Sequence, residues 1–198
     1  MSRYHGHTMS DVVHILGIPS TLRASSFNTG LLRAAQEIAP DGVRIEIFPI
    51  ETLPLYNQDL DGSDEEPPSV REFREKIRAA DALLITCAEY NHSITGVLKN
   101  ALDWASRPLP NHPLKFKSVA LVSATGGASG GMRSKLAMLP ILESTETFLM
   151  MRPEFMIGSA REKFDKQGNL HDEALRNRLA QVISALADFS RQMRAVEA

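Results

Sequence analysis

Short apolar runs alternate with longer amphipathic segments through most of this 198-residue chain. The short runs have the β-branched and apolar composition of strands, and the longer segments place apolar residues three and four positions apart, as in helices. Strands that alternate with helices form βαβ units, in which the strands are parallel. The pattern therefore predicts an α/β domain with a doubly wound parallel sheet and helices on both faces.

Five of the short runs are expected to form strands. The third run is almost entirely apolar, as expected for a strand that is covered on both faces near the centre of a sheet. An apolar patch at Phe148–Met151 precedes the fifth run. The expected strands are Val12–Gly17, Val43–Phe48, Ala82–Cys87, Ser118–Ser123 and Phe155–Gly158.

Each expected strand is followed by a helix. Pro67 and Pro68 suit the start of the second helix, because proline fits a first helical turn. On the register of the third helix Trp104 lies away from the apolar side, so we expect it to be exposed or at an interface. The first, third and fourth helices are expected through Leu31–Ile38, over Thr95–Ser106 and over Met132–Glu143. The second starts at Pro67 and is expected to bury Val70, Phe73 and Ile77. The last helix closes the chain and is expected to bury Leu175, Leu179, Val182, Ile183, Leu186 and Phe189.

The chain is long enough for one sizeable core, which we place in a single domain at residues 11–194. Residues 1–10 are polar and lack the apolar middle of a signal peptide, so we expect a disordered extension. No stretch approaches the about eighteen apolar residues of a membrane-spanning helix. Cys87 is the only cysteine, which rules out an internal disulfide framework and suits a reducing cytosol. We therefore expect a cytoplasmic protein that does not bind membranes.

The net charge of −2 comes from interspersed acidic and basic residues. Proteins that bind nucleic acids usually carry clustered basic residues, so we expect no nucleic-acid partner. A single cysteine also excludes a CxxC motif, and we expect no metal site.

Ligands of doubly wound sheets bind outside the carboxyl ends of the strands, which directs attention to three loops. The first, Ser20–Asn28, combines hydroxyls, Arg23 and an asparagine just before a helix, which suits a phosphate. Alternatively, Ser26 or Asn28 simply caps that helix. The loop has neither P-loop nor GxGxxG spacing, so a monophosphate is favoured over a nucleoside triphosphate or a dinucleotide.

The loop after the third expected strand begins at Ala88 and places polar and aromatic groups where a planar ring can rest on backbone and Tyr90. Asn91 is suited to bonding the edge of a heterocycle. Glu89 and His92 invite an acid–base pair, although a solvated histidine is the alternative. Cys87 is either a reactive thiol or a small core residue. We assign no side chain as catalytic.

The third loop, Thr125–Gly131, is rich in glycine. Missing Cβ atoms let a backbone approach a flat ligand closely, although a flexible surface loop is the alternative. The three loops adjoin at the switch point of a sheet with strand order 2-1-3-4-5. Together they predict a ligand with one phosphate and a flat ring.

At these loops the sequence resembles the NADPH-dependent FMN reductase family, from Val12 to about Phe189. The family motif GSLRxxSxN appears at residues 20–28, PEYNxSxPGxLKNAxDW at residues 88–104, and SxGxxGGxR at residues 125–133. The second match is the longest and most specific. Ser20 replaces a glycine of the pattern, Ala88 and Thr95 replace prolines, and Thr125 supplies the hydroxyl normally given by a serine.

The resemblance implies a flavodoxin-like fold that binds FMN. It implies hydride transfer from NADPH or NADH to the flavin, followed by ping-pong transfer to a small electron acceptor such as a quinone, flavin, azo compound or metal oxyanion. Homodimers or homotetramers are implied as well. The implied cofactor-binding residues are Thr21, Arg23, Ser26, Phe27 and Asn28 at the phosphate, Glu89, Tyr90, Asn91 and His92 beside the isoalloxazine, and Thr125, Gly126 and Gly127 in the third loop.

Two other readings stay open from the sequence. One is a flavodoxin-like electron-transfer or flavin-binding module, which would need a protein partner in place of a nicotinamide site. The other is a scaffold that binds partners through the apolar Met150-Met151 region, which we expect to serve packing or a homodimer interface instead.

Overall fold

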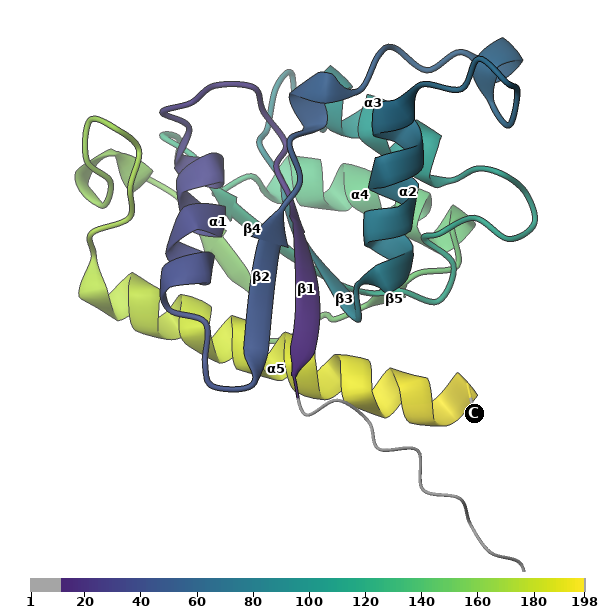
Figure 1. Ribbon diagram of the computed structural model, residues 1–198. Helices are drawn as coiled ribbons and strands as arrows, with labels where there is room; N and C mark the ends of the chain where they lie inside the picture. Colours follow the sequence, from purple (N-terminus) through teal and green to yellow (C-terminus); the bar gives the residue numbers. More distant parts are fainter. Residues whose placement is uncertain (1–11, 198) are drawn as a thin grey trace, which may run out of the picture.

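A parallel β-sheet forms the middle layer of the computed structural model, which describes residues 12–197 (Figure 1). The sheet order is β2-β1-β3-β4-β5, with β6 also paired to β4. This confirms the predicted flavodoxin-like strand order. The extension expected at residues 1–10 lies outside the described residues.

Four of the expected strands are confirmed, with ends that differ by a residue or so. They are β1 (Val13–Ile18), β2 (Val43–Ile47), β3 (Ala82–Thr86) and β4 (Ser118–Ala124). All pairs are parallel, and Leu84 of β3 is in register with Gly17 of β1 and Ala120 of β4. Every residue of β3 is buried, as its apolar composition predicts for a central strand.

The fifth strand predicted at Phe155–Gly158 is confirmed at Phe155–Ile157, but a second short strand that was not predicted shares the same edge of the sheet. β5 (Phe148–Leu149) pairs with the start of β4, and β6 (Phe155–Ile157) pairs with its end. The apolar patch at Phe148–Met151 therefore belongs partly to the sheet. Pro153 lies in the break, and it has no N–H to continue the ladder.

Helices cover both faces of the sheet, as predicted. α1 (Phe27–Glu37) and α5 (Glu173–Glu197) pack on one face, and α2 (Pro68–Ala79), α3 (Gly96–Ala105) and α4 (Met132–Ser144) pack on the other (Figure 1). The predicted inner faces of α2 and α5 are buried, except that Phe189 is only partly covered. The part of the chain that the structure describes also contains short 3-10 helices at Ile50–Thr52, Gln58–Leu60 and Ala160–Glu162.

Trp104 is fully buried, which corrects the expectation that it is exposed or at an interface. The chain between β2 and α2 folds over the side of α3 that the helical register leaves outward. The indole N–H of Trp104 donates to the Pro54 carbonyl at 2.8 Å, and the Tyr56 ring meets the indole edge-on at 4.8 Å between centroids. Periodicity within α3 does not reveal this cover, because the covering residues are distant in sequence.

Arg74 of α2 also holds the loop between β2 and α2 in place. Its guanidinium is buried and pairs with Asp61 at 2.6 Å and with Glu66. Its Nε donates to the Trp104 carbonyl at 2.9 Å. The buried charge is therefore compensated on several sides, as a charge removed from water must be. The loop is fastened to α2 and α3.

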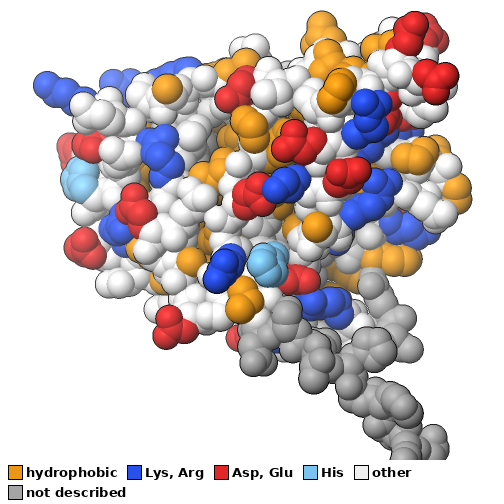
Figure 2. Space-filling model, viewed as in Figure 1, with side chains coloured by type: hydrophobic (Ala, Val, Ile, Leu, Met, Phe, Trp, Pro, Cys, Tyr) orange, Lys and Arg blue, Asp and Glu red, His pale blue; other side chains and the backbone are white. Residues whose placement is uncertain are grey.

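Charged side chains of both signs are interspersed over the face shown in Figure 2. Across residues 12–197, no helix combines the length and the apolar composition that crossing a membrane requires.

Replacing Trp104 with alanine should lower the free energy of unfolding by about 3–5 kcal/mol, the range for removing a large aromatic side chain from a core. The variant loses both the core volume and one of the anchors of the loop that carries Pro54. Urea unfolding followed by circular dichroism measures the change.

Leu55→Ala is the matched control, because Leu55 lies in the same loop and is 85% exposed. We expect its stability to stay within about 0.5 kcal/mol of the parent. Equal losses in the two variants would contradict an anchoring role for Trp104.

Candidate cofactor site

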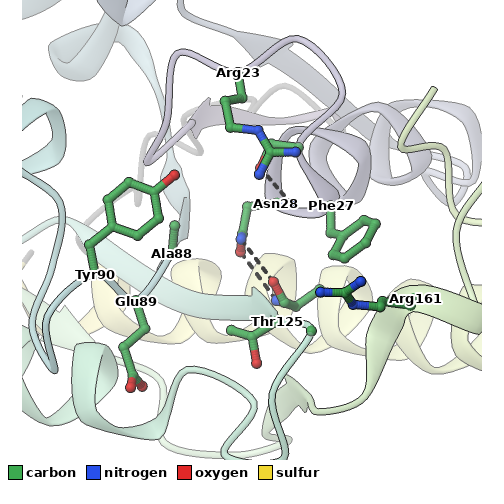
Figure 3. A pocket seen from close by; sticks show the side chains of 11 residues that line it. Arg23, Phe27, Asn28, Ala88, Glu89, Tyr90, Thr125 and Arg161 are labelled. Carbon is green, nitrogen blue, oxygen red and sulfur yellow. Dashed lines mark hydrogen bonds between the residues drawn. The ribbon is translucent and has the colours of Figure 1, made fainter. Parts of the chain in front are cut away.

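A cavity of about 390 Å³ lies at the carboxyl ends of the central strands (Figure 3). Parallel strands place the loops that follow them at the same edge of the sheet, so distant segments meet there. The predicted loops after β1, β3 and β4 all contribute, and the segment after β6 joins them. The lining residues are Arg23, Ser26, Phe27, Asn28, Ala88, Glu89, Tyr90, Ala124, Thr125, Gly126 and Arg161.

Ser26 both lines the cavity and caps α1. Its backbone is extended, and its Oγ accepts from the Asn28 N–H at 3.2 Å. The capping alternative raised by the sequence is therefore confirmed for this residue. Capping does not compete with ligand binding, since the N-terminus of α1 directs its dipole and its first N–H groups toward the same cavity.

Asn28 joins the start of α1 to the end of β4. Its side-chain Nδ2 donates to the Ala124 carbonyl at 2.9 Å, and its Oδ1 accepts from the Ala124 N–H at 3.2 Å. The side chain is buried, and these two bonds fix the orientation of its amide. Asn28 therefore lines the predicted site but also serves as the brace between two of its loops.

Two arginines border the cavity, and neither guanidinium has a hydrogen-bond or ion-pair partner within residues 12–197. Arg23 was predicted, and Arg161 was not. The Arg161 side chain lies over Gly126, where a Cβ would come within 3.2 Å of its Nε. Two unpaired cations beside a helix N-terminus favour an anionic ligand such as a phosphate.

Arg161 is held in place by the backbone around it. The N–H groups of Ser159 and Ala160 donate to the carbonyls of Gly127 and Thr125, each at 2.9 Å. The sequence signal was available, because Arg161 closely follows the last strand at the edge where ligands bind. Arg161 lies outside the three motifs, so its place at the cavity was not predicted.

Glu89 lines the cavity but does not pair with His92. Its carboxylate accepts from the Arg133 backbone N–H at 3.2 Å and from the Arg133 Nη1 at 3.1 Å. Partial burial acts to raise the pKa of Glu89, but the bonds from Arg133 outweigh it and lower the pKa below its usual value. Glu89 is therefore ionised near neutral pH and anchors the start of α4.

Tyr90 is 52% exposed and stands at the mouth of the cavity, whereas the next two residues turn away. Asn91 and His92 have positive φ angles of 50° and 63°, and both are exposed. The turn is closed by paired backbone bonds between Tyr90 and Ser93. Asn91 and His92 therefore lie outside the cavity lining. His92 is exposed to solvent, which was the alternative to an acid–base pair with Glu89.

Thr21 and Gly127 also lie beside the cavity without lining it. The Thr21 Oγ1 accepts from the Arg23 N–H at 3.3 Å, which shapes the first loop. The Gly127 carbonyl accepts from Ser159, as described above. Contacts to a cofactor stay predictions for all the predicted residues, including those that line the cavity.

The glycine-rich loop is tightly packed at its second half, which disfavours the reading of a flexible surface loop. Gly131 has a φ of 85°, and a Cβ there would lie 2.2 Å from the Ser123 Oγ. Only glycine satisfies both the backbone angle and the close approach. The loop therefore enters α4 along a fixed path.

Cys87 is a core residue, the second of the two readings given by the sequence. It is completely buried at the end of β3, and burial raises the pKa of its thiol to about 12. A thiol in this state is a poor nucleophile. Among residues 12–197, no group of three or more His, Cys, Asp or Glu side chains is arranged to hold a metal ion.

Comparison with known sequences finds proteins that are named as FMN reductases or quinone oxidoreductases. Residues 13–162 match the family model described as NADPH-dependent FMN reductase. The chain is 42% identical over 186 residues to an NAD(P)H-dependent FMN reductase of Pseudomonas aeruginosa, covering 94% of this chain and 100% of that protein. It is 41% identical over 184 residues to an NADPH:quinone oxidoreductase of Arabidopsis thaliana, covering 90% and 92%.

Comparison with solved structures gives the same result. The flavoenzyme NAD(P)H:acceptor oxidoreductase FerB from Paracoccus denitrificans is 29% identical and superposes with a TM-score of 0.82, covering 92% of this chain and 99% of FerB. The motifs of the sequence, the strand order and these matches agree along nearly the whole chain. The chain belongs to the NADPH-dependent FMN reductase family.

Proposed function

We propose that this enzyme holds FMN in the cavity and transfers electrons from NAD(P)H to a small acceptor. The observation that carries the proposal is the pair of unpaired guanidinium groups, Arg23 and Arg161, at the N-terminal end of α1 beside a loop with glycine at Gly126. Because NAD(P)H is an intracellular reductant, we place the reaction in the cytoplasm.

The residues suit both ends of FMN. The phosphate end is served by the two arginines, the Ser26 hydroxyl and the first N–H groups of α1. The ring end is bordered by Ala88, Tyr90 and Gly126, which offer backbone and an aromatic surface to a flat heterocycle.

The protein orients the cofactor and controls the charge around it. FMN held there would supply the redox chemistry, namely hydride transfer from NAD(P)H and electron transfer to an acceptor. Glu89 is ionised and engaged with Arg133, so it is not poised to donate a proton.

The proposed function is tested by the visible spectrum of the purified protein under anaerobic conditions. We expect flavin absorbance, loss of that absorbance on addition of NADPH or NADH, and recovery when benzoquinone follows. Chromatography of the released flavin identifies it as FMN. Protein that neither carries nor binds FMN would overturn the proposal.

The same experiment separates the alternative of an electron-transfer module. Bound FMN that neither NADPH nor NADH bleaches would exclude a reductase and favour a module that serves a protein partner.

Arg23→Ala and Arg161→Ala should each weaken FMN binding by roughly 1.5–3 kcal/mol, the range for a hydrogen bond to a charged group. Riboflavin lacks the phosphate, so its affinity should change little in either variant. Fluorescence titration of the apoprotein with both flavins measures the difference.

Arg152→Ala is the control, since the Arg152 side chain is 82% exposed and does not line the cavity. We expect its affinity for FMN to match the parent. If an arginine variant loses FMN and riboflavin equally, that arginine does not bind the phosphate.

A second groove supports an apolar acceptor such as a quinone over a metal oxyanion. It has a volume of about 440 Å³, and Leu22, Tyr90 and Val97 are among the residues that line it. Arg23 and Tyr90 border both the groove and the cofactor cavity, so the two adjoin. Planar apolar molecules are favoured on such a surface.

We further propose that the enzyme is a homodimer, which is supported by apolar side chains exposed near one end of α4. Met132 and Leu136 are 38% and 56% exposed and lie one helical turn apart. Met151 is 56% exposed, whereas Met150 is buried in the core and does not contribute to a surface.

Leu136→Glu should shift the protein toward monomer, because a charge would enter the buried apolar contact. Light scattering coupled to size-exclusion chromatography measures the mass. Leu109→Glu, at a residue that is 66% exposed in another loop, is the control. A parent protein that is already monomeric would contradict the homodimer.

A further inference from the structure

A buried chain of hydrogen bonds connects the loop after β1 with the loop after β3. Ser20 and Thr86 have no exposed surface. The Ser20 N–H donates to the Thr86 Oγ1 at 2.8 Å, and the two hydroxyl oxygens are 3.0 Å apart. The Ala88 N–H donates to the Ser20 Oγ at 2.8 Å. Ser20 is thus bonded to the next strand through both its backbone and its side chain.

The protons of this chain have one arrangement that uses every donor. The Ser20 Oγ accepts from Ala88, so its own proton can go to the Thr86 Oγ1. The Thr86 proton then points to the Ile18 carbonyl, at a longer distance of 3.5 Å. If the Thr86 hydroxyl instead donated to the Ser20 Oγ, the buried Ser20 hydroxyl proton would have no acceptor, which costs free energy.

Thr95 adds a third attachment. Its Oγ1 donates to the Ser20 carbonyl at 2.6 Å and accepts from the Leu98 N–H at 3.2 Å, which caps α3. Thr95 is 3% exposed. The first loop is therefore bonded to the end of β3, to Ala88 and to the start of α3.

Three members of this network, Ser20, Ala88 and Thr95, are positions where the chain departs from the family motifs. A glycine at position 20 would offer no hydroxyl, and a proline at position 88 would offer no N–H. Serine at 20 and a residue with an N–H at 88 therefore depend on each other. If residue 88 has no N–H, the Ser20 hydroxyl loses one hydrogen bond. If residue 20 has no hydroxyl, the N–H of residue 88 is buried without an acceptor.

We propose that Ser20 is a positioning residue that sets the phosphate loop at a fixed distance from the loop beside the flavin ring, and that Ala88 is its obligate partner. The proposal rests on the proposed function. Arg23 lies three residues after Ser20 and borders the phosphate end of the cavity, while Ala88 itself lines the cavity next to Glu89 and Tyr90. A shift between the two loops therefore changes how one FMN molecule can bind at both ends.

A double-mutant cycle of Ser20→Gly and Ala88→Pro tests the coupling. Apoproteins are titrated with FMN, and the midpoint potential of the bound flavin is measured in each holoenzyme. S20G alone should weaken FMN binding about tenfold and shift the potential, because it leaves the Ala88 N–H buried without an acceptor. In the A88P background there is no such N–H, and S20G should change the affinity less than about twofold.

Equal effects of S20G in the two backgrounds, or no effect in either, would overturn the proposal. If S20G alone fails to fold, a folded double variant that binds FMN supports the coupling, and a double variant that also fails to fold contradicts it. If the parent protein binds no FMN, the proposed function is wrong. If the parent binds FMN but the effects of the two substitutions are additive, only this inference is wrong.

Ser190→Ala is the matched control. Ser190 is 1% exposed, and its hydroxyl donates to the Ala187 carbonyl at 2.8 Å within α5, far from the cavity in sequence and outside its lining. Its loss should affect thermal stability alone. Ser20→Thr keeps the hydroxyl and should retain FMN affinity and potential closer to the parent than S20G.

Discussion

The parallel pairing of β1, β3, β4 and β6 is the constraint on which the rest of the structure depends. Parallel strands end at the same edge of the sheet, so the segments that follow these four strands start at one edge, and each contributes residues to one cavity. The arrangement also directs the N-terminus of α1 at the cavity, which supplies a partial positive charge without any side chain. The charge of Arg23 and Arg161 adds to that field.

Placing loops at one edge does not fix the distances between them. Buried hydrogen bonds between segments far apart in sequence do so here. Asn28 joins the start of α1 to Ala124, Ser20 joins the first loop to Ala88, and Ala160 joins the last segment to Thr125. Each bond satisfies backbone groups where a strand ends and its ladder stops, so the same contacts that relieve unpaired polar groups also hold the site in shape.

Patterns that are local in the sequence predicted the local features well. The apolar run of β3, the prolines at the start of α2 and the inner faces of α2 and α5 were confirmed, because each depends on periodicity or on the backbone limits of a single residue. The errors concern contacts between distant segments. Trp104 is buried by the loop that carries Pro54 and Tyr56, and the edge of the sheet is shared by two strands because both find partners on β4.

The sequence by itself determined the α/β class and the three loops, and its motifs determined the family and, through the fold of that family, the strand order. It did so because alternating periodicity and motif spacing are properties of the chain read in one dimension. Only the tertiary structure decided that Arg161 borders the cavity, that Asn91 and His92 turn away from it, and that Ser20, Ala88 and Thr95 form one network. Those facts depend on distances between segments as many as 138 positions apart, such as Arg23 and Arg161, which no local pattern records.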